Sequence, residues 1–339
     1  MQFDAKTWTA SPQEMAEVAR YAERLGFAGL WNDETKHDPY LCLALATQST
    51  ERIELGISIA LAFPRSPTVA AHSSWDLQQL SKGRFILGLG TQVKAHITRR
   101  FGMTWAPPAA RMREYVQAMR QVWECWQNGR PPDFTGQYYT VTLMNHMFNP
   151  GPIPYKMPPV YLAGAGPLMI RLAGELADGL AVHPLNTVRY LKDSVLPGIR
   201  EGAARAGRDP KSVVIASSVF AITGRTKAEK AEERKAVRRW IAFYASTPTY
   251  RPSMLDPYGW GEINPRLNQL AKEGKWEEME RVIPEDMERE VAVTGEWDEL
   301  VPQLRQRYEG LVDRIHLMVD FGPGDRSAFW EALAKSARS

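Results

Sequence analysis

The repeated alternation of apolar strands with amphipathic helices constrains the fold of this 339-residue chain more than any other feature. Most of the strand segments are near-continuous apolar runs, and helical stretches lie between them. Such strands are typical of a parallel sheet whose faces are covered by helices. Because eight strand–helix units close most economically into a barrel, the pattern predicts an α/β fold of the (β/α)8 TIM-barrel type. The predicted strands are residues 2–6, 29–33, 53–62, 85–89, 160–163, 180–183, 213–223 and 314–319.

Local signals mark where several helices begin and end. Ser11, Pro12 and Glu14 have the spacing of a capping box with proline at the first helical position, and Gly26 provides a stop. Ser66 before Pro67 caps a third helix in the same way. The predicted helices are residues 11–25, 39–50, 67–80, 168–177, 188–206 and 227–245.

Two stretches do not fit this repeat, and they are predicted to be insertions after strands four and seven of a single domain, residues 1–339. Residues 101–157 contain a long helix at 111–127 and a short hairpin at 134–141, and residues 247–296 carry prolines and acidic helices. Insertions in barrels commonly lie at the C-terminal rim, so both are candidate walls or lids of a ligand site. Packing or subunit contact alone is the alternative.

Composition argues against several functional classes. A formal net charge of +3 without a basic run argues against nucleic acid as a partner. Cys42 and Cys125 lie far apart without CxxC spacing, which argues against disulfides and a zinc site. No apolar run approaches the roughly 20 residues that span a bilayer, so no membrane partner is expected and the chain is predicted to be cytoplasmic.

The sequence also lacks the common motifs of metal and acyl-transfer catalysis. The histidines have no HExxH or carboxylate-rich metal spacing, and neither a GxSxG elbow nor a Walker loop occurs, so no metal is expected. Glycine-lined positions with few strong nucleophiles suit instead an enzyme whose cofactor carries the reaction of a small-molecule substrate.

Ionisable residues are concentrated after the second strand. Asp33, Glu34, His37 and Asp38 lie within a few positions of one strand exit, which is where barrels place catalytic side chains. Carboxylates and an imidazole there can position a cofactor ring and move a proton. The alternative is that Asp38 caps the next helix while Asp33 or Glu34 pairs with a lysine.

Glycine-rich exits follow the fourth and fifth strands. Residues 88–92, GLGTQ, present backbone N–H groups to which a planar or anionic ligand can come close. Residues 163–166, AGAG, precede a helix and suit a phosphate at its N-terminus. Simple chain turns are the alternative for both segments.

Several cations and one histidine are further candidates. Lys94, His96, Arg99 and Arg100 form a small basic cluster that can attract an acidic ligand tail, although such a run can also be a solvated face. Arg65 is an anion contact or a structural arginine. His183 ends strand six and carries low weight, because a lone histidine is more often structural than catalytic.

Taken together, these motifs resemble the bacterial luciferase-like superfamily over nearly the whole chain. The resemblance rests on GFAGLW at 26–31, RSP at 65–67, SKGRFILGLG at 81–90 and AGELADG at 173–179. Further motifs resemble the actinobacterial branch that depends on coenzyme F420: TQVKAH at 91–96, RRFG at 99–102 and RMREY at 111–115. The resemblance implies a (β/α)8 barrel that holds a flavin or deazaflavin at its mouth, commonly as a homodimer.

The resemblance also implies roles for particular residues. Glu34 matches an acidic residue that relatives keep, and Thr35 stands where they commonly have histidine, so His37 becomes the candidate proton donor. A cis peptide that relatives carry in strand three maps onto Ser58 and Ile59. The expected catalytic residues are therefore Glu34 and His37. The expected cofactor contacts are Glu34, Ser58, Ile59, Gly90, Thr91, Gln92, Ala163, Gly164, Ala165 and Gly166.

The function expected from this resemblance is hydride transfer between F420 and an unidentified small organic substrate. An FMN-dependent luciferase-like monooxygenase is the first alternative, because the same barrel serves both chemistries. A flavin- or deazaflavin-binding protein without catalysis is the second.

Overall fold

In the computed structural model, which describes residues 1–338, eight parallel strands close into a barrel, and this confirms the predicted fold class. Each strand pairs with the next around the ring; β8 pairs with β9 and β11 pairs with β1, so the ring has no break. The barrel strands are β1 (Gln2–Thr7), β2 (Gly29–Asn32), β3 (Glu54–Leu61), β4 (Phe85–Gly90), β7 (Val160–Gly164), β8 (Gly179–Val182), β9 (Val214–Ile222) and β11 (Arg314–Leu317).

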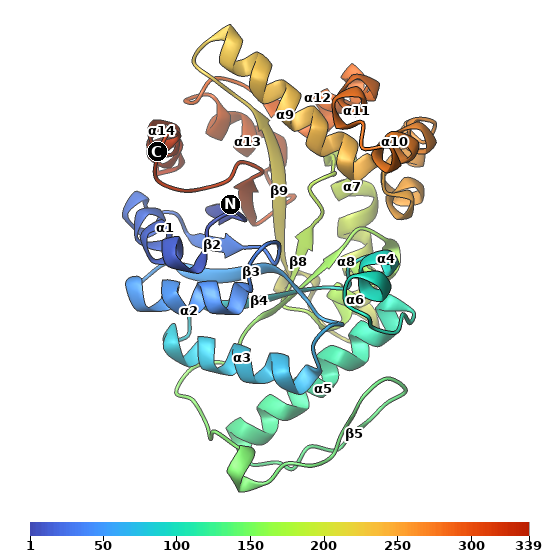
Figure 1. The fold of residues 1–339 in the computed structure, drawn as a ribbon. Coiled ribbons are helices and arrows are strands. Elements are labelled where there is room, and N and C mark those ends of the chain that lie inside the picture. The colour runs from blue at the N-terminus through green and yellow to red at the C-terminus, as the bar shows by residue number, and fades with distance from the viewer. Residues whose placement is uncertain (339) are drawn as a thin grey trace.

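Helices surround the barrel, as the strand–helix alternation predicts (Figure 1). The capping signals act as expected: the Glu14 carboxylate accepts from the Ser11 N–H at 2.8 Å, and Ser66 Oγ accepts from the Val69 N–H at 3.2 Å. The longer outer helices are α1 (Pro12–Leu25), α2 (Pro39–Ser49), α3 (Pro67–Leu80), α5 (Pro108–Asn128), α6 (Pro167–Leu176), α8 (Leu196–Arg205), α9 (Lys227–Ala245), α13 (Leu300–Tyr308) and α14 (Ser327–Arg338).

One predicted helix contains an irregular turn. Residues 188–205 are helical throughout, as expected, but they form a short α7 (Val188–Tyr190), a π-helical turn (Leu191–Val195) and then α8, with helical backbone angles at both junctions. Pro197 explains the π-helical turn, because proline has no N–H to donate to the preceding turn and its ring displaces that turn's carbonyl. Three-residue helical turns also occur at His146–Phe148, Pro210–Ser212, Pro248–Tyr250 and Asp256–Tyr258, and a second π-helical turn at Arg251–Leu255.

In the first inserted stretch, α5 packs against α3 and supports a short hairpin. Residues 101–157 contain the predicted long helix, as α5, and the predicted hairpin, as β5 (Phe134–Thr135) and β6 (Thr140–Val141). The carboxylate of Glu114 on α5 accepts three backbone N–H groups of the hairpin turn. In Figure 1 this hairpin extends past α5. It is therefore fastened to the outside of the barrel.

The second inserted stretch is largely helical and lies beside α9 (Figure 1). It contains α10 (Ile263–Lys272), α11 (Trp276–Val282) and α12 (Glu285–Val291). It ends in a strand that the sequence did not predict, β10 (Ala292–Thr294), which pairs in parallel with the end of β9. Trp260 in this stretch is buried and donates from Nε1 to Asp286, which is a packing role.

The barrel interior combines an aromatic layer with a buried ion pair. Trp31, Ile86, Tyr161 and Ala216 pack together inside the strands. Gly56 makes room for them, because a Cβ at this position would lie 2.3 Å from the Trp31 ring. Arg314 on β11 forms a bidentate pair with Asp4 on β1, at 2.8 Å for each bond. In the described residues, no helix is long and apolar enough to cross a bilayer.

Candidate active site

The carboxyl ends of five neighbouring strands form the open end of the barrel, which we call the mouth. The strand interiors are buried, whereas the residues at these ends are only half-buried. A ligand can therefore reach backbone and side chains here without opening the core. The half-buried residues are Asp33, Glu34, Ser58, Ile59, Thr91, Gln92, Ala163, Gly164, Ala165, Gly166 and His183.

Glu34, the expected catalytic and cofactor-orienting acid, is held by Arg65 and the end of β3. Its Oε2 accepts from the Leu61 N–H at 2.8 Å and from Arg65 Nη1 at 2.7 Å. Arg65 Nη2 also reaches Asp38 Oδ2 at 2.8 Å. Burial alone would lower the pKa of the Arg65 guanidinium. The hydrogen bonds to Glu34 and Asp38, together with the charge of Glu34, outweigh burial and raise this pKa above its usual range. Arg65 is thus a structural arginine rather than an anion contact, the two alternatives that the sequence left open.

The residues after Glu34 turn away from the barrel. The Thr35 hydroxyl donates to the Trp8 carbonyl at 2.8 Å. Asp38 caps α2 by accepting from the Tyr40 N–H at 2.9 Å. His37 is exposed, on the side of the mouth where its charge can act on Glu14 at the start of α1. The structure therefore does not bring His37 together with Glu34, and its catalytic role stays a prediction.

The end of β3 forms the predicted bulge. The Ser58–Ile59 peptide is cis, as expected, and the register between β3 and β4 shifts between Ile57 and Ala60. The Ile59 side chain covers β4 so closely that a Cβ on Gly90 would lie 2.1 Å from its Cδ1. Gly90 is therefore required by packing.

The two residues after Gly90 end β4 in a tight turn. Gln92 has a positive φ of 55°, and its Oε1 accepts from the Val93 N–H at 2.9 Å. The Thr91 hydroxyl bonds only to the Gln92 carbonyl, at 3.3 Å. These two polar side chains lie at the mouth, and each of them makes one local hydrogen bond.

The two glycines at the end of β7 have different surroundings: Gly164 is packed against α6, and Gly166 has open space beside it. A Cβ on Gly164 would lie 2.5 Å from the Met169 side chain, so Gly164 is required by helix packing. Gly166 caps α6, and a Cβ there would meet nothing within 4 Å. The Ala165 carbonyl accepts from Tyr190 at 2.6 Å. The open space beside Gly166 leaves the first backbone groups of α6 accessible, which suits a phosphate.

The sequence did not single out Lys6, which pairs with Asp33 inside the mouth. Lys6 is 5% exposed; its Nζ lies 3.0 Å from Asp33 Oδ1 and 3.3 Å from the Ser58 carbonyl oxygen. The alternative that Asp33 pairs with a lysine is thus confirmed. Burial raises the pKa of Asp33, the Lys6 ammonium opposes this rise, and the Asp320 carboxylate adds to it. A lysine close to the carboxyl end of the first predicted strand was the available signal.

His183 lies in an aromatic cluster that the sequence also did not predict. Its ring centroid is 4.7 Å from that of Tyr244 and 4.3 Å from that of Tyr250. Its Nδ1 accepts from the Leu185 N–H at 3.1 Å. Burial, with a smaller contribution from Lys6, lowers the pKa of His183 to about 3. His183 is therefore neutral near pH 7.

A rim of cations lies beside the mouth. The short helix α4 (Lys94–Arg99) follows β4, and Arg100 after it reaches the Thr35 carbonyl at 3.5 Å, so the exits of β2 and β4 touch. Lys94, His96 and Arg99 are exposed, and none has an acidic partner within residues 1–338. We call this set, with Arg100, the cationic rim.

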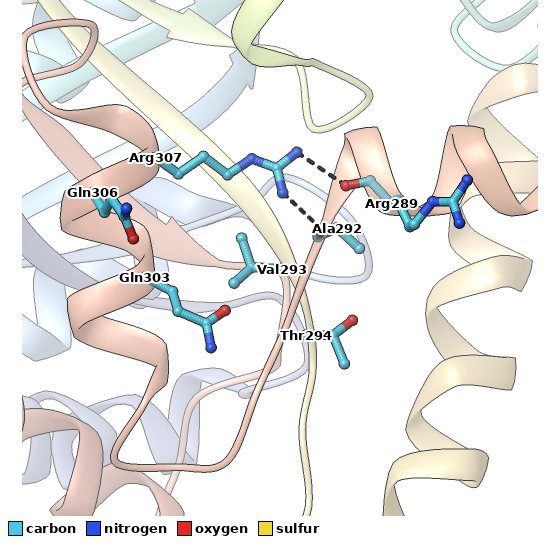
Figure 2. Close-up of a pocket in the computed structure, with 7 residues that line it drawn as sticks. All are labelled: Arg289, Ala292, Val293, Thr294, Gln303, Gln306 and Arg307. Atoms are coloured by element: carbon cyan, nitrogen blue, oxygen red, sulfur yellow. Dashed lines mark hydrogen bonds between the residues drawn. The ribbon is translucent and has the colours of Figure 1, made fainter.

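A surface hollow elsewhere does not have the chemistry of the mouth. The hollow lies beside β10, between α12 and α13 (Figure 2). Its volume is about 450 Å³. Arg307 extends across it and donates to the carbonyls of Arg289 and Ala292. It contains no carboxylate or histidine side chain, and no metal-type cluster of His, Cys, Asp and Glu occurs in the part of the chain that is described.

Comparison with known proteins identifies relatives along nearly the whole chain. A family model described as luciferase-like monooxygenase matches residues 2–314. An uncharacterized protein of Mycobacterium tuberculosis is 46% identical over 307 residues, which is 90% of each chain. The 5,10-methylenetetrahydromethanopterin reductase of Archaeoglobus fulgidus is 26% identical over 325 residues, 93% of this chain and 92% of the reductase.

A solved structure supports the same fold. The coenzyme F420-dependent tetrahydromethanopterin reductase from Methanopyrus kandleri superposes with a TM-score of 0.80 at 22% identity. The superposition covers 99% of this chain and 97% of that one. At 22% identity this similarity shows that the two chains share a fold, and it does not identify a substrate.

Proposed function

Because the chain belongs to the luciferase-like monooxygenase family, we propose that it is an oxidoreductase that uses coenzyme F420 to reduce or oxidise a small organic substrate. The cationic rim beside the mouth is the observation that carries this choice. Unpaired cations favour a ligand with an extended anionic tail, and F420 has such a tail whereas FMN ends in one phosphate. The relatives named as F420-dependent or methanopterin reductases support the same choice.

The residues at the mouth fit a deazaflavin. Gly166 leaves open space at the start of α6, which suits the phosphate, and Ile59 offers an apolar surface for a planar ring. Glu34, fixed by Arg65, would hold the end of β3 beneath that ring. Thr91, Gln92 and the backbone of residues 163–166 would contact the ligand along the next two strands, β4 and β7. When bound, the deazaflavin supplies or accepts the hydride.

The aromatic cluster around His183 would form the apolar side of the substrate site. Tyr244 and Tyr250 flank a histidine that stays neutral, so this side carries no charge near pH 7. Apolar walls exclude water and keep the transferred hydride from side reactions.

The experiment is a fluorescence-quenching titration with F420 and with FMN at low and high salt. We expect F420 to bind more tightly, and its advantage to shrink as salt rises. The variant Lys94→Glu/Arg99→Glu should weaken F420 binding by about tenfold, since each exposed charge contributes up to about 1 kcal/mol and is reversed.

The matched control is Lys211→Glu, which changes an exposed lysine just before β9, at the other end of the barrel. It should leave both affinities unchanged. Tight FMN binding without an F420 signal would favour the FMN-dependent monooxygenase instead, which the family description also supports. Binding without turnover of any substrate would favour a carrier protein.

We also propose a homodimer. Leu41 and Leu45 on α2 and Val69 on α3 are large apolar side chains with 44–65% exposure on the outer faces of neighbouring helices. Exposed apolar side chains gathered in this way are typical of subunit contacts. Light scattering on the purified protein measures the assembly directly.

A further inference from the structure

The mouth contains several ionisable side chains, and most of them are already held in hydrogen bonds to other protein groups. Glu34 is held between Arg65 and the Leu61 N–H, and Asp38 caps α2. His37 is exposed on the outer side. None of these three is both at the mouth and free to exchange a proton with a bound ligand.

The aromatic side of the mouth is no better a source of protons. His183 is neutral near pH 7, because its pKa is lowered to about 3 by burial and by Lys6, so it carries no imidazolium proton to give. Burial raises the pKa values of Tyr244 and Tyr250, and for Tyr244 the charge of Asp33 adds to the rise. Both phenols therefore hold their protons firmly.

Asp33 is the remaining acid, and its two oxygens have different surroundings. Oδ1 is buried and forms an ion pair with Lys6 Nζ at 3.0 Å, at an angle that does not make a hydrogen bond. The side chain as a whole is 22% exposed, and Oδ2 has no hydrogen-bond partner among the residues described. One oxygen is thus anchored while the other can reach a ligand.

Lys6 connects this carboxyl to the floor of the site. It extends from β1 past β2 to the Ser58 carbonyl on β3, so one side chain links the first three strands at the mouth. Its position fixes the orientation of Asp33, since both partners are held by strands.

The local charge balance favours a proton on or near this pair. The Asp33 carboxylate lies beside one ammonium, that of Lys6, and the charge of a second carboxylate, Asp320, also acts on it. Asp320 is tied to the chain after β1 through the Trp8 N–H at 2.8 Å and the Thr7 hydroxyl at 3.2 Å. The other ionisable groups near the pair are the neutral rings of His183 and His316 and the phenol of Tyr244.

We propose that Asp33 is the catalytic acid–base of the mouth and that Lys6 is its positioning residue. This inference rests on the proposed hydride-transfer function. For reduction of a polarised double bond, the substrate carbon gains a hydride, with two electrons, from the reduced deazaflavin. The substrate heteroatom gains the proton of the Asp33 carboxyl. Asp33 is left as a carboxylate, and water returns its proton; in oxidation each transfer is reversed.

The first test needs no cofactor. Infrared titration of the ligand-free protein should show a carboxyl that protonates above the usual aspartate range. Asp33→Asn should remove this signal, and Lys6→Met should move it to higher pH because the nearby cation is gone. Lys6→Arg, which keeps the charge, should restore most of the wild-type titration. The matched control Asp76→Asn, an exposed carboxylate on α3, should leave it unchanged.

The second test measures single turnover with F420 and a substrate found by screening. Asp33→Asn should slow turnover by about 10² to 10⁴, as expected for loss of general acid catalysis, while its F420 dissociation constant changes less than about threefold. Lys6→Met should shift the pH profile of turnover, which a purely structural role would not do. Thermal melts of each variant report whether the barrel remains folded.

The outcomes separate the two proposals. If the wild-type protein does not bind F420, the proposed function fails, while the infrared titration still decides whether Asp33 holds the proton. An unchanged infrared signal in Asp33→Asn overturns the inference. So does a loss of turnover in His37→Ala without one in Asp33→Asn, because the proton would then come from the outer rim.

Discussion

Removing Arg314 should destabilise the barrel far more than removing an ordinary surface arginine. Arg314 is 4% exposed, and the Asp4 side chain with which it pairs is fully buried. Asp4 accepts three hydrogen bonds of 2.8 Å, two from Arg314 and one from Trp31 Nε1. Arg314→Met leaves the carboxylate with only the Trp31 bond. An uncompensated buried charge costs about 3–5 kcal/mol, so the free energy of unfolding should fall by about that amount.

A surface pair provides the matched control. Arg189 and Asp193 lie one helical turn apart and are 62% and 61% exposed, so Arg189→Met should change stability by less than about 0.5 kcal/mol. Urea unfolding followed by both fluorescence and circular dichroism measures each variant. The double variant Asp4→Asn/Arg314→Met should cost less than the two single changes added together, because no charge is then left unpaired. A loss of less than about 1 kcal/mol in Arg314→Met would refute the reasoning, since Asp4 would then have found water or another donor.

Two further predictions concern the mouth. Because burial lowers the pKa of His183 to about 3 from 6.5, the unfolded chain binds a proton between these pH values that the folded protein does not, so stability should fall as pH drops below about 6.5. His183→Phe should flatten this fall by up to about 1.4 kcal/mol per pH unit, as measured by urea midpoints from pH 7.5 to 5. Gly166→Ala should cost at most about 1 kcal/mol of stability, because the added Cβ meets nothing within 4 Å, yet it should weaken F420 binding in a fluorescence titration. Unchanged affinity in that variant would count against the predicted contact.

The fold could be predicted from sequence because its signals are local. Apolar runs, caps such as Ser11 with Glu14, and turn residues determine each element separately, and eight repeats leave few alternatives to a barrel. The features that were missed lack a local signal of their own. The helical pattern of residues 188–206 does not show the π-helical turn before Pro197, and β10 is too short to show a period of its own.

The site was only partly predictable, since its pairs join residues far apart in sequence. The exits of β2, β3, β4 and β7 could be identified, because every barrel strand ends at the same mouth. The partner of Asp33 could not, since it depends on the register of β1 against β2, which aligns Lys6 with Trp31. The same holds for His183, whose aromatic neighbours come from α9 and the turn after it.

Strand geometry explains how two consecutive carboxylates come to have opposite surroundings. Trp31 faces the barrel interior, and side chains two positions apart along a strand point to the same side, so Asp33 continues inward toward Lys6. Glu34, one position later, turns outward to Arg65 and the end of β3. The outward carboxylate fixes the chain at the mouth, and this leaves the inward one half-exposed in a defined position.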